Sequence, residues 1–594
     1  MTSRALILRG LQHYWRTNLA VVAGVATAVA VLAGALLVGD SVRGSLRDLV
    51  LQRLGRTDRI VVATNFFRAA LADDLRGDAD FAAAYSDITP LIVMQGLVTE
   101  QGSGRRASRV QVYGVDDRFW RFHQVAGRTG PADREAFLSR ALAADVGAAA
   151  GGTVLVRVER PSAIPTESLH GQKEDPGRTV RLTVGAVIDP DQLGDFSMQP
   201  QQGAVRAVFV RLSRLQQDLD QKQLVNAMLV ADHGPPNGDT LTTLLKRHAR
   251  LEDYALSLQT LDDREALAVE TTAGFIDTPR SDAIEHAGVV SGTQPRPVLT
   301  YLANSIRSGD RQVPYSLVTA ISAPEIAPEL TRASTVDPDA SRMPPPIVLN
   351  DWTARQLAVK PGDPVFLDYY VWQEPGALAT RSAEFKLAAI VPIAGAAADR
   401  RLAPVYPGIS DADTLGDWDP PFPIDLKRVR PVDEAYWNQY RTTPKAFIPF
   451  GAGRELWTSR YGDRTSFRIL SAGQSLAEAR RRFETALRAE LDPSRMGFTV
   501  RGVRAEALDA SRGSTDFGEY FVYFSFFLVA SALVLAVLFF RLGVEQRARE
   551  VGLLRAVGFS TPRVRRLFAA EGLLLALAGS ILGMAGAVAY GALM

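Results

Sequence analysis

The sequence predicts a membrane protein with three α-helical transmembrane segments and a large mixed α/β extracytoplasmic domain made of two related lobes. Three observations predict this fold class. Long uncharged apolar runs lie near both ends of the chain, the middle reads as ordinary soluble sequence, and two similar stretches recur within that middle. The 594 residues are also too many for one compact hydrophobic core.

The first apolar run predicts a membrane-spanning helix over residues 19–39, after a short cytoplasmic N-terminus at residues 1–18. A helix of this length crosses about 30 Å of hydrocarbon. A cleaved signal peptide is the alternative, but the run exceeds the usual apolar length of about 7 to 15 residues. Apolar residues continue at helical spacing over residues 40–59, which predicts a stalk beyond the membrane.

The region after the stalk alternates between strand-like and helix-like patterns, which indicates mixed α/β structure. Residues 133–147 and 475–491 are predicted to be helices. Residues 140–156 resemble residues 351–367 at a constant offset of 211, which predicts an internal repeat. We therefore expect lobe A at 60–288, lobe B at 289–510, and a second stalk at 511–520.

Two further apolar runs, at residues 521–540 and 572–593, predict the second and third membrane helices. The segment between them, 541–571, is rich in arginine and is expected to be cytoplasmic, which puts residues 40–520 and the C-terminus outside. Small residues recur every fourth position in the third run and predict close helix packing. These residues are Gly579, Gly583, Ala587 and Gly591.

Composition and motifs argue against several functions. A net charge of +2 does not favour nucleic-acid binding, and the absence of cysteine excludes thiolate metal sites and cysteine nucleophiles. The six histidines are scattered without metal-ligand spacing, and no phosphate-binding loop or nucleophile-elbow motif occurs. We therefore predict no catalytic residue, metal or cofactor in this chain, and an extracytoplasmic hydrolase lacks its motifs.

The segment 545–572 is predicted to form a helix, a tight turn and a second helix. Glu545 and Arg549 have the spacing of a helical ion pair, and Gly558 suits a helix end. Thr561 and Pro562 suit the N-cap and first turn of the next helix. A basic surface that only attracts anionic membrane lipids is the alternative interpretation of this segment.

The stretch EVGLLRAVG at 550–558, followed by Glu571, resembles the cytoplasmic signature of the FtsX/MacB family of ABC permeases. The resemblance implies a segment that docks on a separate ABC ATPase subunit, a MacB-like periplasmic core, and a multi-pass location in the cell (inner) membrane. The resemblance implies that the residues that dock on the ATPase are Glu550, Gly552, Leu554, Arg555, Gly558 and Glu571. The family's fourth helix is missing after Met594, so we expect an incomplete chain, a second permease half or a homodimer.

The resemblance implies a permease that transmits force from the ATPase to the extracytoplasmic lobes, for export or for handling of lipoproteins, lipids, peptides or drugs. The alternative is an FtsX-like membrane-anchored scaffold that regulates an envelope enzyme without transporting cargo. An ATPase whose activity depends on Arg555 would favour the first interpretation.

Overall fold

The computed structural model describes residues 3–593 except 160, 162–176, 200, 202, 235–239, 333–343, 374–376, 407, 421 and 512–516. The chain divides into two compact units. A helical unit comprises Met1–Gly55, Phe196–Ala204 and Val503–Met594, and a sheet-rich unit comprises Arg56–Asp195 and Val205–Gly502. The central part of the predicted stalk at 511–520 lies outside the described residues.

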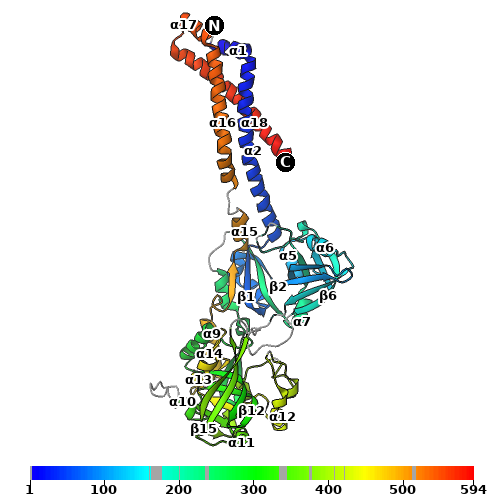
Figure 1. The fold of residues 1–594 in the computed structure, drawn as a ribbon, viewed down its shortest axis with the longest axis vertical. Helices are drawn as coiled ribbons and strands as arrows, with labels where there is room; N and C mark the ends of the chain where they lie inside the picture. The colour runs from blue at the N-terminus through cyan, green and yellow to red at the C-terminus, as the bar shows by residue number, and fades with distance from the viewer. Residues whose placement is uncertain are drawn as a thin grey trace. The chain divides into compact units, whose positions relative to one another are not determined.

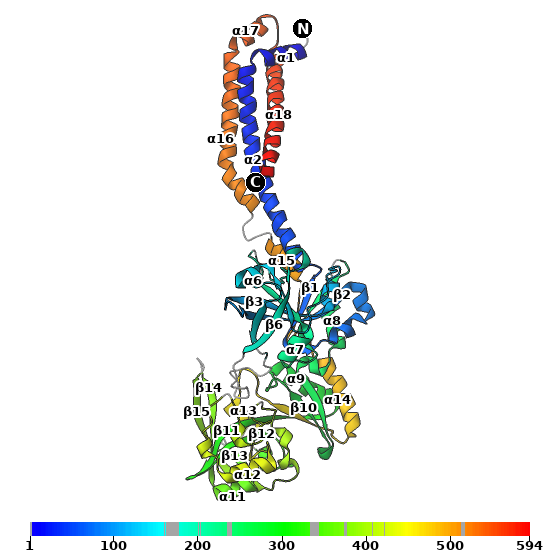
Figure 2. The same ribbon diagram turned by 90° about the vertical axis from the view of Figure 1, so that its right-hand side faces the viewer.

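The helical unit contains three long helices (Figure 1), which lie side by side in the view of Figure 2. The longest is one unbroken helix, so the predicted first span and most of the predicted stalk form a single rod. The helices of the helical unit are α1 (Ser3–His13), α2 (Trp15–Leu54), α15 (Val503–Ser511), α16 (Phe517–Gln546), α17 (Ala548–Ala556) and α18 (Thr561–Leu593). The longest of them is α2.

Among the described residues, two helical segments are long and apolar enough to cross a membrane, Trp15–Gly34 and Thr561–Ala589. The predicted span at 521–540 lies within α16, where many side chains lie outside the described set, so a third span stays a prediction. The helices expose large apolar side chains, as lipid-facing helices do. They include Phe526, Phe527, Leu533, Leu573, Ile581 and Val588.

Helix α18 packs closely on α2 through glycines. A Cβ placed on Gly579 would lie 2.7 Å from the Val25 Cβ, and one on Gly583 would lie 2.6 Å from the carbonyl oxygen of Ala26. Ala587 is 1% exposed on the same helix. The small residues thus let two backbones approach more closely than any larger side chain would allow. Gly591 belongs to α18, and its surroundings lie outside the described set.

The sheet-rich unit begins with a nine-stranded sheet in the order β18-β1-β8-β2-β3-β7-β4-β6-β5, and β5 also pairs with β2. Six strands therefore close into a barrel beside a short open sheet. The strands are β1 (Arg59–Arg68), β2 (Tyr85–Glu100), β3 (Arg106–Val115), β4 (Glu135–Ser139), β5 (Thr153–Glu159), β6 (Gly177–Ile188), β7 (Ala207–Arg211), β8 (Leu224–Asp232) and β18 (Phe498–Arg501). The helices are α3 (Leu71–Arg76), α4 (Ala79–Ala84), α5 (Asp117–Phe122), α6 (Arg140–Val146), α7 (Leu212–Asp218) and α8 (Thr240–His248).

A second nine-stranded sheet has the order β9-β10-β17-β11-β12-β16-β13-β15-β14, and β14 also pairs with β11. Its strands are β9 (Leu256–Leu261), β10 (Ala266–Thr271), β11 (Gln294–Ser308), β12 (Arg311–Ile321), β13 (Pro346–Asn350), β14 (Pro364–Gln373), β15 (Ala377–Val391), β16 (Ala446–Ile448) and β17 (Ser466–Leu470). The helices are α9 (Thr278–Ser291), α10 (Glu329–Arg332), α11 (Asp351–Leu357), α12 (Pro431–Tyr440), α13 (Phe450–Trp457) and α14 (Leu476–Glu490).

The two sheets share their strand order, and their parallel and antiparallel pairings also correspond. The predicted repeat falls on equivalent elements, α6 with β5 and α11 with β14. Ser139 caps α6 and Asn350 caps α11 at the same offset, each accepting from the backbone N–H three residues on. The helices then end at Gly147 and Ala358, both left-handed, so the local geometry repeats as well.

Each sheet receives one strand from the part of the chain that follows the other sheet, and we call this the strand exchange. The strand after α8 is β9, which pairs with β10 of the second sheet, and the strand after α14 is β18, which pairs with β1 of the first. One core cluster accordingly contains Val61 and Val230 together with Leu267 and Phe467. The second sheet therefore begins at Leu256, earlier than the predicted boundary between 288 and 289, and its chain returns to the first sheet before 510.

The predicted helix at 133–147 is wrong in its first half, while the predicted helix at 475–491 corresponds to α14. Glu135–Ser139 forms β4, with Ala136 and Leu138 fully buried between β6 and β7. The helix begins only at Arg140, because the Ser139 hydroxyl caps it. Pairing of β4 with β6 and β7, which lie far along the chain, thus outweighs the helix-like sequence pattern of these residues.

Candidate functional site

The arginine-rich segment between α16 and α18 folds as the predicted helical hairpin. Helix α16 ends at Gln546, α17 runs from Ala548 to Ala556, and α18 begins at Thr561. Gly558 has a φ of +97°, a left-handed conformation that favours glycine and ends α17. The N-cap lies one residue earlier than predicted, because the Ser560 carbonyl accepts the first helical hydrogen bonds.

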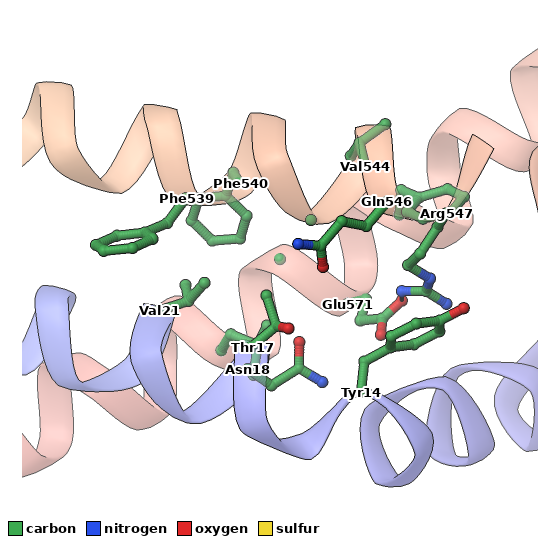
Figure 3. Close-up of a pocket in the computed structure, with 14 residues that line it drawn as sticks. Tyr14, Thr17, Asn18, Val21, Phe539, Phe540, Val544, Gln546, Arg547 and Glu571 are labelled. Atoms are coloured by element: carbon green, nitrogen blue, oxygen red, sulfur yellow. Dashed lines mark hydrogen bonds and ion pairs between the residues drawn. The ribbon is translucent and has the colours of Figure 1, made fainter.

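Arg547 lies at the break between α16 and α17 and is 8% exposed. Its guanidinium donates to both carboxylate oxygens of Glu550, at 2.7 and 3.2 Å, and to Oε2 of Glu571 at 2.8 Å. Two charge-assisted contacts of this kind hold both helices that flank the turn. Figure 3 shows Arg547, Glu571 and Tyr14 gathered at one place.

Aromatic rings complete the surroundings of Arg547. The guanidinium carbon lies 4.5 Å from the ring centroid of Tyr14 and 4.7 Å from that of Phe568. Tyr14 stands at the break between α1 and α2, so the N-terminal elbow joins the same cluster. A Cβ on Gly10 would lie 2.8 Å from the Arg547 Nη2, which shows how closely α1 approaches. We call Arg547, Glu550, Glu571, Tyr14 and Phe568 the arginine cluster.

The predicted ion pair between Glu545 and Arg549 is wrong. Glu545 instead accepts from the Nε of Arg541 at 3.0 Å, one turn earlier on α16. The helix breaks at Arg547, so Glu545 and Arg549 belong to different helices and lose the regular four-residue spacing. Arg549 is exposed on α17.

The structure divides the predicted docking residues into two groups. Gly552, Arg555 and Gly558 are exposed, and Leu554 is half-buried. Glu550 and Glu571 instead face inward and bind Arg547.

Helix α17 and its C-cap also expose two apolar residues that the sequence analysis did not single out. Leu553 is 66% exposed and Val557 is 71% exposed. Leu553 and Val557 are four residues apart and share one side, whereas Arg555 points to another side. This short helix therefore offers both apolar and basic groups for contact with another protein.

Sequence reasoning missed Arg547 as the centre of the cluster. Its spacing of three residues from Glu550 was visible as a helical pair. Its contacts with Tyr14 and Glu571 join positions far apart in the chain, and no local pattern predicts them.

Residues 522–594 match the family model described as FtsX-like permease C-terminal. This segment is similar to FtsX-like permease C-terminal regions. The FtsX-like region contains α17, α18 and most of α16, so it includes the hairpin. The match supports an ABC-transporter permease role in a membrane protein, and the family in general works with an ABC ATPase. No curated protein sequence matches the chain.

Among the solved structures that are similar to this chain, two each match about one third of it. The periplasmic region of MacB from Actinobacillus actinomycetemcomitans has 13% identity and a TM-score of 0.22, and the match covers 33% of this chain and 86% of that one. The extracellular domain of the noncanonic ABC-type transporter YknZ from Gram-positive bacteria has 11% identity and a TM-score of 0.20, covering 33% and 91%.

Proposed function

We propose that this chain is the permease subunit of an ABC transporter and that α17 receives force from a partner ATPase. The observation that carries the proposal is the exposure of α17 and of its C-cap within the FtsX-like region, where Leu553, Arg555 and Val557 are all exposed. ATP is bound and hydrolysed in the partner, and this chain contributes no catalytic residue, metal or cofactor.

The proposal includes three membrane spans, with the hairpin in the cytoplasm and two related extracytoplasmic lobes in a multi-pass inner-membrane protein. The concentration of arginine between α16 and α18 supports this orientation, because short basic loops stay on the cytoplasmic side. The matching strand orders of the two sheets support two lobes of common origin. A second permease half or a second copy of this chain completes the transporter.

Force passes from α17 to the spans through the arginine cluster. Arg547 contacts Glu571 of α18 and Tyr14 beside α2, so a push on α17 reaches both helices without crossing a flexible loop. Because α2 is one unbroken helix from Trp15 to Leu54, displacement at its start is carried to its far end. The lobes then move and act on cargo outside the bilayer.

The test is co-purification of the full chain with its candidate ATPase, followed by measurement of ATP hydrolysis in the complex. Arg555→Glu combined with Gly558→Leu is expected to abolish stimulation by removing the docking charge and straining the turn. Arg566→Glu on α18 is the control, because it makes the same charge change at another exposed arginine. If the double variant stimulates as the wild type does, or if both charge reversals act equally, docking by α17 is refuted.

A further inference from the structure

A cavity of about 600 Å³ lies in the sheet-rich unit, where the end of β1, the start of α5 and helix α7 meet. Its volume is within the usual range for ligand pockets, about 300 to 1,000 Å³. The turn that leads into β8 forms another wall. In that turn the carbonyl oxygen of Gln223 accepts from the backbone N–H of Ala69 at 2.9 Å, which holds the wall against the end of β1.

The two carboxylates on the walls of this cavity already bind arginines. Asp116, at the start of α5, binds Arg118 at 2.8 Å. Asp73, on α3, binds Arg76 at 2.7 Å and Arg118 at 3.4 Å. These acidic groups are therefore balanced by their own partners, and the cavity presents no unpaired negative charge for a cationic ligand.

Two other cationic side chains on the walls bind no carboxylate among the described residues. Arg211, at the start of α7, donates to the carbonyl oxygen of Pro131 at 3.2 Å. Lys222, in the turn before β8, forms neither an ion pair nor a hydrogen bond within the described part of the chain. Arg68 differs from them, because it binds Asp253 at 2.7 Å. Clefts that present charge of one sign concentrate ions of the opposite sign, so this cavity favours an anion.

The number of unpaired charges and the apolar floor narrow the class of anion. A phosphate monoester carries about −1.5 to −2 at pH 7 and balances both cations, whereas a carboxylate balances one. Arginine and lysine are the side chains that commonly bind phosphate, and the Ser213 hydroxyl on the same wall is a further donor. Next to them, Leu212 is buried and Leu224 is half-buried, which suits an apolar substituent on the phosphate.

We propose that this cavity binds a phosphate monoester that carries an apolar substituent. The phosphate oxygens accept from Arg211 and Lys222, and the substituent lies on Leu212 and Leu224. The bound phosphate ties the start of α7 to the turn that precedes β8. This inference goes beyond the proposed function, because it rests on the sheet-rich unit alone and not on docking by α17.

Equilibrium dialysis of the purified full chain in detergent tests this proposal with phenyl phosphate, inorganic phosphate and benzoate. We expect phenyl phosphate to bind roughly tenfold more tightly than inorganic phosphate, which lacks the apolar group, and than benzoate, which carries one charge. Its affinity should rise as the second phosphate proton is lost near about pH 6. No binding of phenyl phosphate, or equal binding of benzoate, overturns the proposal. Equal binding of inorganic phosphate refutes the apolar substituent.

Paired variants assign the binding to this cavity. Lys222→Met and Arg211→Met are each expected to lower the affinity for phenyl phosphate roughly tenfold. Both side chains are exposed, so the fold should be retained, and a thermal melt checks this. Lys246→Met is the matched control, because Lys246 is exposed on α8 and lies outside the cavity. Unchanged affinity in both cavity variants, or an equal loss in the control, refutes the assignment.

Discussion

Replacing Arg547 with methionine should release α17 from the helices on either side. The Arg547 side chain is 8% exposed and forms contacts of 2.7 and 2.8 Å with Glu550 and Glu571. Its removal therefore leaves two carboxylates without this ion-pair partner, and the carboxylate of Glu571 is buried. Removing one partner of a buried ion pair costs about 3 to 5 kcal/mol. If this free energy is lost from the contacts that hold α17 in place, the equilibrium population of molecules with α17 detached rises at least about a hundredfold.

Hydrogen exchange of the full chain in detergent measures this opening directly, because exchange of protected amides reports local unfolding. Amides of α17 and of the first turns of α18 should exchange faster, while those of β1 and β8 stay unchanged and serve as internal reference. Arg549→Met is the matched control, since it removes an exposed arginine two residues away and should change local stability by less than about 0.5 kcal/mol. Equal exchange in the two variants would show that Arg547 does not hold α17.

Three further predictions concern burial and packing. Burial lowers the pKa of Lys445 from 10.5 to about 8, so the unfolded chain binds more protons between these values and stability should rise with pH across that window. Lys445→Met should stabilise the fold by about 1 to 3 kcal/mol at pH 7 and flatten that rise in thermal melts, and an unchanged pH profile would contradict the burial argument. Gly583→Ala places a methyl group against the Ala26 carbonyl and should cost about 1 to 3 kcal/mol in detergent stability, whereas Gly586→Ala meets only ordinary contact and should cost little. Asn350→Ala removes the cap of α11 and two further buried hydrogen bonds, so thermal unfolding should show a loss of about 1 to 3 kcal/mol, and no loss would exclude a capping role.

Local patterns predicted much of this molecule. Gly558 ends a helix with a positive φ, as its position after an amphipathic stretch indicates, and α14 falls within one residue of its predicted bounds. The offset of 211 located two equivalent helix–turn–strand units, because capping and turn geometry are written into adjacent residues.

Features that depend on distant contacts could not be predicted in this way. The local sequence of β4 predicts a helix, but β4 is a strand because it pairs with β6 on one side and β7 on the other. The predicted boundary between lobes missed the strand exchange, since nothing in Leu256–Leu261 identifies which sheet it joins. The arginine cluster likewise requires Tyr14, Arg547 and Glu571 to meet from three separate helical segments.

The strand exchange determines where the membrane anchors connect to the domain. Helix α2 leads into β1 and helix α15 follows β18, and these two strands are neighbours, with Ile60 opposite Arg501. Both covalent connections therefore end at the same rung of one hydrogen-bonded ladder. Both strands belong to the open part of the first sheet, outside its closed barrel. The chain that leaves β1 continues through α3 and α4 to β2, whereas the chain that reaches β18 comes from α14 and the second sheet.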